Sequence, residues 1–371
     1  MTADNREQLL ALLQRHKDLG ISEQIDHEKY YLYSIITHST AIEGSTVTEV
    51  EAQLLFDEGI TSNKRTIIEQ NMNLDLKSAY EYGREWIKKH ADITSDWLII
   101  LASKVMERTG SEYHSPGGDF SAAKGELRKL NVTAGVGGKS YMSYLKVPTR
   151  LAEFCKKLNE KRRLTNPTDL ASVYELSFWA HFELVTIHPW ADGNGRMSRL
   201  LMNLIQMEFD VLPTKVLKED KAEYIQALID TREKEDIEIF LNSMTEMHCR
   251  HIQQDIDNYI LSFGDEMTDE TEKVVDKKEK MVDKSALTEK MVDKWQIKPS
   301  LAEKLADILL FMDGKEQVTT EVVTRQFGFN ATTSRRYLRQ LTEFGILEAQ
   351  GANKNRSYRM CKKEHAKVVF F

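Results

Sequence analysis

Apolar residues recur at spacings of three and four positions along most of the first 262 residues. This period places them on one face of an α-helix, so the pattern predicts a largely helical body. The ranges that follow it are 1–19, 22–43, 64–89, 94–107, 147–160, 168–186, 195–209, 219–231 and 235–262. No run of about 18 apolar residues is available to span a membrane. We therefore expect an all-α fold with no membrane partner.

One segment inside this body breaks the helical pattern. The sequence from Gly125 to Pro148, GELRKLNVTAGVGGKSYMSYLKVP, is rich in glycine and β-branched residues. These residues are unfavourable inside helices and common in strands and turns. We predict a β-hairpin or an ordered loop there.

The composition changes after residue 262. EKVVDK at 272–277 and EKMVDK at 279–284 and 289–294 form an imperfect charged repeat, which predicts a helical linker over 263–300. Residues 301–371 contain 12 Lys and Arg against 8 Asp and Glu, whereas the whole chain has a formal net charge of -7. Three short helical patterns followed by two strand-like pieces predict a winged helix-turn-helix domain there.

The third helix of this domain is basic, and two interpretations of it stay open. Arg335, Arg336 and Arg339 lie near its exposed face, where they can meet DNA phosphates or guanine edges. On this interpretation DNA binds through 330–359. Winged helices also serve as dimerisation or protein-docking modules, and fold alone does not fix function.

The chain has the composition of an ordinary cytoplasmic protein. Its first residues, MTADNREQLLALLQRHKD, carry acids and an amphipathic rhythm in place of a secretory signal. Its three cysteines, Cys155, Cys249 and Cys361, are far apart and outside any C-x-x-C spacing, so neither a disulfide framework nor a zinc site is indicated.

The stretch HPWADGNGRMSR, which begins at His188, concentrates chemical groups at a predicted helix start. Apolar residues from Met197 onward place the helix directly after the glycines. The Gly193-Asn194-Gly195 turn then presents unpaired backbone N–H groups at the positive end of the helix dipole, which favours an anion. Two nearby guanidinium groups, those of Arg196 and Arg199, suggest a polyphosphate.

Two further residues of this stretch fit a reaction on that polyphosphate. Asp192 would repel phosphates unless it holds Mg²⁺, which prefers one or two carboxylates together with phosphate oxygens. His188 can act as a general base, because a near-neutral imidazole can remove the proton of an incoming hydroxyl. The predicted chemistry is group transfer to Ser, Thr or Tyr.

These residues resemble the signature H-P-F-x-[D/E]-G-N-G-R-x-x-R of Fic-family enzymes, with Trp190 in place of the usual phenylalanine. The resemblance implies an all-α Fic-type catalytic body, here over 95–262, that transfers AMP from ATP to a protein hydroxyl and releases pyrophosphate. It also implies a role for each matched residue. These are His188 as base, Asp192 as Mg²⁺ ligand, Gly193, Asn194 and Gly195 as phosphate nest, Arg196 as phosphate contact, and Arg199 as partner of the γ-phosphate.

Two other segments are similar to elements of that family. Residues 125–145 look like the flap, a β-hairpin that pairs with an extended segment of the target protein. Ser39-Thr40-Ala41-Ile42-Glu43-Gly44, in the N-terminal helical region 1–94, is similar to the inhibitory motif [S/T]-x-x-x-E-[G/N]. We expect the Glu43 carboxylate to form a bidentate pair with Arg199 and so remove the cation that the γ-phosphate needs.

Several alternatives stay open at this point. The chain can be a nucleotide-sensing, DNA-binding transcriptional regulator, or a Fic enzyme that transfers another phosphate-containing group. Self-modification is a further expectation, Glu43 can activate water for the removal of AMP, and a homodimer is one way to displace the inhibitory helix.

Overall fold

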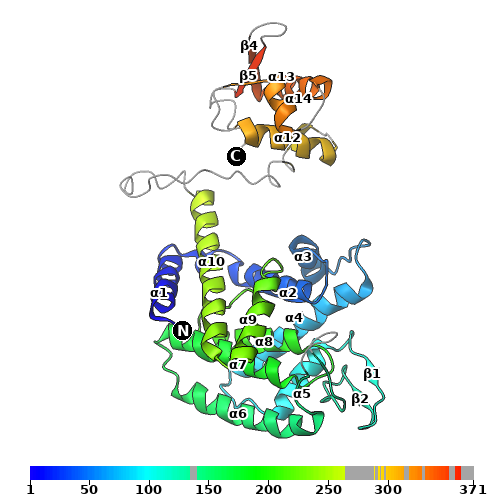
Figure 1. Ribbon diagram of the computed structural model, residues 1–371, viewed down its shortest axis with the longest axis vertical. Helices are drawn as coiled ribbons and strands as arrows, with labels where there is room; N and C mark the ends of the chain where they lie inside the picture. The colour runs from blue at the N-terminus through cyan, green and yellow to red at the C-terminus, as the bar shows by residue number, and fades with distance from the viewer. Residues whose placement is uncertain are drawn as a thin grey trace. The chain divides into compact units, whose positions relative to one another are not determined.

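The computed structural model describes residues 1–133, 140–263, 288, 291–292, 294–295, 298–312, 317–327, 331–350 and 356–360. The chain divides into two compact units, Met1–Glu270 and Thr271–Phe371, and each is considered by itself (Figure 1). Most of the predicted linker over 263–300 lies outside the described residues. Among the residues that are described, no helix combines the length and the apolar character needed to cross a bilayer.

The first unit is mainly helical, as the apolar spacing predicts. Its helices are α1 (Ala3–Asp18), α2 (His27–Ile42), α3 (Glu49–Glu58), α4 (Ile67–Ile87), α5 (Ser95–Val105), α6 (Val147–Leu164), α7 (Leu170–Ile187), α8 (Asn194–Glu208), α9 (Lys221–Lys234) and α10 (Ile237–Phe263). Short 3-10 turns cover Ile21–Glu23 and Tyr144–Lys146.

Three features of the first unit differ from the predicted elements. Helix α3 was not predicted, although Thr48 and Glu51 form a capping box that is readable in the sequence. The predicted helix 22–43 begins only at His27, because Asp26 adopts a left-handed conformation with φ 61°. A two-stranded antiparallel sheet of β1 (Glu112–Tyr113) and β2 (Phe120–Ser121) was also not expected.

Helices α7 and α8 form the centre of the first unit (Figure 1). One cluster of buried apolar side chains joins them to α2, α4, α5 and α6, and a second joins them to α1, α9 and α10. Apolar side chains of the surrounding helices therefore pack on this helix pair from nearly every direction. This packing holds the turn between α7 and α8 rigidly in place.

Among its described residues, the second unit contains helices and a small sheet. Helices α12 (Pro299–Met312), α13 (Thr320–Phe327) and α14 (Ala331–Glu343) precede strands β4 (Leu347–Gln350) and β5 (Ser357–Met360). A short strand that was not predicted, β3 (Val318–Thr319), completes an antiparallel sheet of order β3-β5-β4. A separate cluster of buried apolar side chains holds these elements together. The assignment of this unit to the winged-helix class stays a prediction.

We expect Gly125→Ala to destabilise the first unit much more than Gly59→Ala. Both glycines have a positive φ, 68° in each case, which costs any other residue roughly 1–2 kcal/mol. A Cβ on Gly125 would also lie 2.1 Å from the carbonyl oxygen of Ile99, whereas nothing lies within 4 Å of one on Gly59. The backbone displacement at Gly125 should lower the free energy of unfolding by about 1–3 kcal/mol more, which urea unfolding can measure. An equal loss of unfolding free energy in Gly125→Ala and Gly59→Ala would contradict this account.

Candidate active site

The turn between α7 and α8 carries the signature stretch. Helix α7 ends at Ile187, and its C-cap residue His188 has a left-handed backbone with φ 53°; α8 begins after Gly193, which has φ 81°. A side chain at Gly193 would be strained, and its Cβ would lie 2.8 Å from the Sδ atom of Met106. The turn therefore requires glycine at this position.

Asn194 fixes the shape of this turn. Its Oδ1 accepts a hydrogen bond of 3.1 Å from the backbone N–H of Trp190, and its Nδ2 donates one of 2.8 Å to the Trp190 carbonyl. The indole of Trp190 is buried and donates to the carbonyl of Gly125 at 2.9 Å. The Asn194 side chain is thus committed to the protein, so the predicted phosphate nest can offer an anion only backbone N–H groups. Of these, the N–H of Gly193 donates to Oδ1 of Asp192 at 2.6 Å.

The imidazole of His188 is held in its neutral form. Burial lowers its pKa to about 4, and the positive charges of Arg128 and Arg232 act in the same direction. Its Nδ1 lies 3.4 Å from the carbonyl oxygen of Val185. A proton on Nδ1 can point to that oxygen, and Nε2 then keeps a lone pair for accepting a proton.

Arg196 is a buried cation, and two of its donor atoms are unpaired among the described residues. Arg196 is 2% exposed, and neither its Nε nor its Nη1 has a hydrogen-bond partner within the described part of the chain. Burial lowers the pKa of this guanidinium. Its Nη2 lies 3.6 Å from Oδ1 of Asp192, a side chain that is 57% exposed. Unpaired buried donors are costly, and the oxygens of a phosphate would satisfy them.

Arg199 is buried as well, but its donors are occupied. Its Nε donates to the hydroxyl of Ser39 at 2.9 Å, and its Nη2 donates to the Ser39 carbonyl at 2.9 Å and to Oε1 of Glu43 at 2.6 Å. The expected bidentate pair between Glu43 and Arg199 is therefore wrong. Ser39 takes the Nε edge of the guanidinium, so only one carboxylate oxygen of Glu43 is bound.

The carboxylate of Glu43 lies over the first turn of α8. A Cβ added to Gly195 would be 2.5 Å from Oε1 of Glu43. Burial opposes ionisation of Glu43, but the charge of Arg199 and the hydrogen bond from it outweigh burial and lower the pKa of the carboxyl. Gly44 follows with φ 104°. A charged carboxylate thus occupies the helix start at which an anion is expected to bind.

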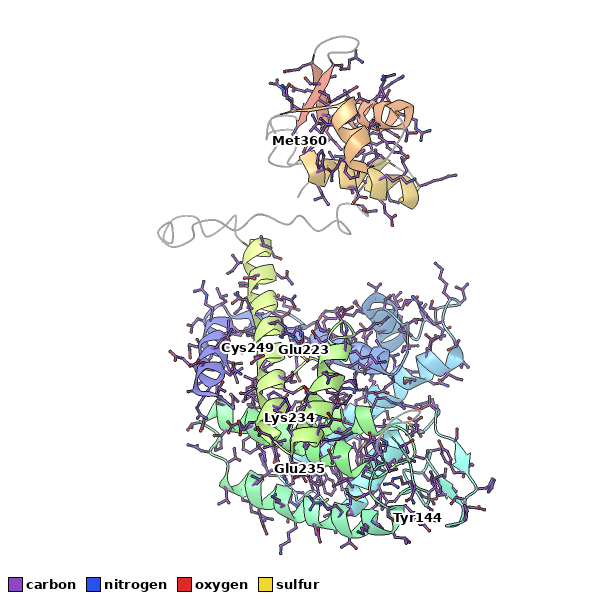
Figure 2. All side chains as sticks on the ribbon, viewed as in Figure 1. Tyr144, Glu223, Lys234, Glu235, Cys249 and Met360 are labelled. Carbon is purple, nitrogen blue, oxygen red and sulfur yellow. The ribbon has the colours of Figure 1, made fainter. Side chains whose placement is uncertain are left out.

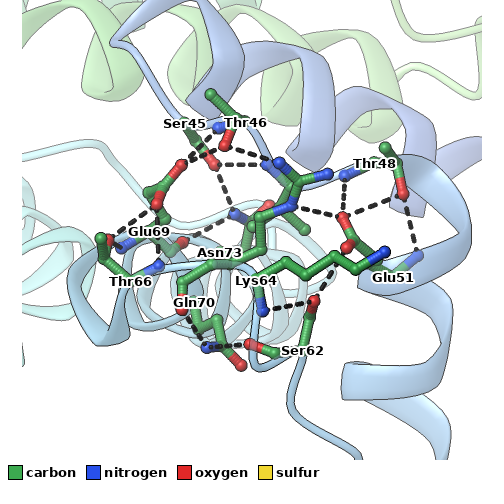
Figure 3. A network of polar contacts seen from close by, with 12 residues as sticks. Ser45, Thr46, Thr48, Glu51, Ser62, Lys64, Thr66, Glu69, Gln70 and Asn73 are labelled. Carbon is green, nitrogen blue, oxygen red and sulfur yellow. Dashed lines mark hydrogen bonds and ion pairs between the residues drawn. The ribbon is translucent and has the colours of Figure 1, made fainter.

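The segment that carries Glu43 is tied to α4 by Asn73 (Figure 3). The Thr40 hydroxyl donates to Oδ1 of Asn73 at 3.0 Å, and Nδ2 of Asn73 donates to the Ser45 hydroxyl at 3.3 Å. Thr40 and Asn73 are fully buried. One asparagine therefore holds the chain on both sides of Glu43.

A second tie involves Glu69, which belongs to the capping box of α4. Its carboxylate accepts hydrogen bonds from the N–H and hydroxyl of Thr66, and also from the N–H and hydroxyl of Thr46 at 2.7 and 2.6 Å. The threonine hydroxyls and backbone N–H groups lower its pKa to about 2. The sequence pattern T-x-x-E predicts that Glu69 takes part in the cap of α4. No sequence signal predicts the hydrogen bonds between Glu69 and Thr46.

Arg128 joins the turn to the predicted flap. It is 1% exposed, and its guanidinium donates to three backbone carbonyls: His188 at 2.8 Å, Leu130 at 2.7 Å and Met142 at 2.6 Å. Sequence reasoning missed this residue, because nothing in the motif indicates which arginine of the preceding segment turns inward.

The predicted hairpin over 125–145 is described only at its base. Thr133 and Ser140 form an antiparallel bridge, and Tyr141 donates its backbone N–H to the carbonyl of Val132 at 3.0 Å. Residues 134–139 lie outside the described residues. The two arms therefore run antiparallel at this point, and the use of the segment as a flap stays a prediction.

The geometry defines a helical domain in which a glycine turn at a helix N-terminus lies beside a neutral histidine. Residues 92–206 match the sequence model of the Fic/DOC family. This part of the chain is a Fic domain, and the turn with its histidine lies inside it.

Curated relatives carry the same domain in longer proteins. The chain is 29% identical over 204 residues to protein adenylyltransferase fic-1 of Caenorhabditis elegans, covering 54% of this chain and 36% of that protein. It is 29% identical over 219 residues to protein adenylyltransferase Fic of Drosophila melanogaster, covering 59% and 40%. The match thus spans about two fifths or less of these relatives.

Solved structures of Fic proteins share the fold. A Fic-1 fragment from Caenorhabditis elegans superimposes with a TM-score of 0.55 at 23% identity, covering 70% of this chain and 74% of that chain. A Fic family protein from Desulfovibrio desulfuricans gives a TM-score of 0.52 at 17% identity, covering 98% and 97%. At these identities the likeness establishes the mostly helical Fic-type fold.

We expect Asn73→Ala to loosen the Glu43 segment. The substitution removes the hydrogen bonds to Thr40 and Ser45, so local opening should become more frequent. Hydrogen exchange of the amides of residues 43–45 should accelerate roughly tenfold, equivalent to losing about 1.4 kcal/mol of local protection. Asn71→Ala, two residues earlier on α4, is the matched control. Unchanged exchange in Asn73→Ala would show that other contacts hold the segment.

Proposed function

We propose that this chain transfers AMP from ATP to a Ser, Thr or Tyr hydroxyl of a protein, including its own chain, and that Glu43 inhibits the reaction. The observation that supports this most is the buried guanidinium of Arg196 beside a glycine turn, since its Nε and Nη1 have no hydrogen-bond partner in the part of the chain that the structure describes. A nucleotide phosphate supplies the acceptors that these donors lack.

In the proposed reaction each signature residue has one task. Backbone N–H groups of Gly193 to Gly195 and the Arg196 side chain bind the phosphates. Mg²⁺, when bound, neutralises charge on the phosphate oxygens, and the exposed carboxylate of Asp192 is the side chain suited to hold it. Arg199 binds the γ-phosphate once Glu43 has moved away.

His188 removes the proton from the attacking hydroxyl. The hydroxyl oxygen forms a bond to the α-phosphorus, the bond from that phosphorus to the bridging oxygen of pyrophosphate breaks, and the proton passes to Nε2. A neutral imidazole is required, and the low pKa of His188 supports this state at pH 7. The target segment is proposed to pair with the flap over 125–145, where backbone hydrogen bonds require little sequence specificity.

Glu43 inhibits by occupying the place of the γ-phosphate. Its carboxylate binds Arg199 at 2.6 Å and lies over Gly195, so a phosphate would meet negative charge and an occupied arginine. ATP then binds weakly or in a pose in which the α-phosphorus is turned away from His188. Displacement of the segment, for example within a homodimer, restores the productive pose.

We expect Glu43→Gly to raise protein labelling from ATP carrying its label on the α-phosphate. Removal of the carboxylate frees Arg199, so labelling should increase at least about tenfold over wild type. The double variant Glu43→Gly with His188→Ala should lose roughly 100-fold or more, because it lacks the base. Labelling is followed on the enzyme itself and on proteins of a lysate, with Mg²⁺ present.

Two controls make this result specific. ATP labelled on the γ-phosphate should give no labelled protein, since that phosphate leaves with pyrophosphate. Donors such as CTP, GTP and UTP test the transfer of a different phosphate-containing group. If Glu43→Gly binds ATP but labels no protein with any donor, the chain is not a transferase under these conditions and the nucleotide-sensor alternative gains support.

A second candidate function is DNA binding by α14. Arg335, Arg336 and Arg339 are exposed on this helix and line a hollow of about 390 Å³ together with Gln340 and Glu343. Arg339 is paired with Glu343 at 2.8 Å, so the other two arginines carry most of the available positive charge. This arrangement supports contacts to phosphates, which would make the chain a DNA-binding regulator that senses nucleotide.

We expect Arg335→Ala with Arg336→Ala to weaken DNA binding and to flatten its salt dependence. Each lost phosphate contact lowers the slope of log affinity against log salt by about one. Gel shift or fluorescence anisotropy between low and moderate salt measures this slope. Lys304→Ala on α12, which removes one positive charge from another helix of the unit, is the control. A wild-type chain that binds no DNA at low salt would exclude this function.

A further inference from the structure

The aromatic ring of Tyr141 covers the imidazole of His188, although the proposed reaction gives Tyr141 no part. The two rings are stacked, with 3.9 Å between their centroids and an angle of 19° between their planes. Tyr141 lies on the second arm of the predicted flap, directly after Ser140 of the antiparallel bridge. A flap residue therefore contacts the candidate base itself.

Arg232 of α9 lies against the same tyrosine. Its Cζ is 5.0 Å from the centroid of the Tyr141 ring, and its Nη1 donates to the Tyr141 hydroxyl at 3.4 Å. The guanidinium also donates to the Thr186 hydroxyl at 3.4 Å and the Val185 carbonyl at 3.3 Å. Arg232 thus anchors the tyrosine to the last turn of α7, next to His188.

We propose that Tyr141 and Arg232 form a clamp that positions the imidazole of His188 and couples its orientation to the flap. Both are positioning residues, because they act through His188. The inference rests on the proposed function, in which His188 is the base. The clamp itself is a property of the fold, and it can be measured without any transferase assay.

The other contacts of His188 do not fix the orientation of its imidazole ring, and the clamp supplies this constraint. The ring nitrogen Nδ1 has only a long contact of 3.4 Å to the Val185 carbonyl, and Arg128 holds the backbone carbonyl rather than the ring. Stacking fixes the plane of the imidazole, and within that plane the contact to the Val185 carbonyl keeps Nδ1 toward α7. Nε2 then keeps its lone pair directed away from α7, where an incoming hydroxyl can reach it.

The same contact can transmit the state of the flap. The Tyr141 backbone is bound to Val132, and Arg128 binds the carbonyls of Leu130 and Met142 on the two arms. A target strand that pairs with the hairpin therefore acts on a segment that is connected to both the backbone and the ring of His188. Docking of the target and orientation of the base become coupled.

The imidazole titration reports directly on the clamp. Groups that influence it are the positive charges of Arg128 and Arg232, the negative charge of Glu43, the Val185 carbonyl, and burial, to which the stacked tyrosine ring contributes. Burial and the two arginines lower the pKa of His188, while Val185 and Glu43 raise it. Loss of the ring or of the Arg232 charge must therefore raise this pKa.

We test the clamp by NMR titration of His188 in the full-length chain, with the signal assigned from His188→Ala. The wild-type imidazole should titrate with a pKa of about 4. Tyr141→Ala and Arg232→Gln should each move the pKa toward the ordinary value of 6.5. Tyr141→Phe keeps the stacked ring and should stay near wild type.

Two matched controls show whether the shift is specific. Tyr144→Ala removes another tyrosine of the same segment, and Lys234→Gln removes another positive charge of α9; both positions are labelled in Figure 2. Neither should change the titration. If Tyr141→Ala leaves the pKa and the preferred tautomer of His188 as in wild type, or if Tyr144→Ala shifts them equally, the clamp is overturned.

Kinetics in the Glu43→Gly background separate positioning from target docking. Tyr141→Ala should lower kcat roughly 10- to 100-fold with little change in KM for ATP, and Tyr141→Phe should restore most of the rate. A change confined to KM for the target protein would overturn the clamp and make Tyr141 a docking residue. If Glu43→Gly is inactive while the NMR shifts occur, the proposed function fails and the clamp stands.

Discussion

The architecture of the candidate site depends on the satisfaction of a buried guanidinium. Arg199 lies in the centre of the first unit, and removing such a cation from water costs several kcal/mol unless it is paired. Ser39 and Glu43 supply the acceptors, and both belong to the end of α2. The pairing therefore fixes α2 against α8, and the segment can leave only if another anion satisfies Arg199.

The two arginines of α8 have different partners. Arg199 is satisfied by the protein, whereas Nε and Nη1 of Arg196 are buried without partners among the described residues. An anion at the helix start would complete the coordination of Arg196 and compete with Glu43 for Arg199. In the proposed function, inhibition by Glu43 and binding of a ligand are therefore two alternative ways to meet the same electrostatic requirement.

The proposed base is controlled by contacts outside the signature. Arg128 binds the carbonyl of His188 and both arms of the hairpin, Tyr141 stacks on the His188 ring, and Arg232 lies against Tyr141. These residues come from the flap segment and from α9, far from the motif in sequence. Burial and the charges of Arg128 and Arg232 lower the pKa of the His188 imidazole to about 4, so the ring stays neutral well below pH 6.5, at which an ordinary histidine is half protonated.

The sequence by itself determined the helical body and the turn at the start of α8, because helical periodicity and turn chemistry are local properties. The pairing of Glu43 with Arg199 was expected only from the resemblance to an inhibitory motif, since the two residues are far apart in the sequence. Tertiary structure decided what depends on contacts between distant segments. It committed the Asn194 side chain to Trp190, limited Glu43 to one oxygen, and selected Asn73, Arg128, Tyr141 and Arg232 as supports. Packing between distant segments sets the direction in which a side chain points. The spacing of residues along the sequence does not contain this information.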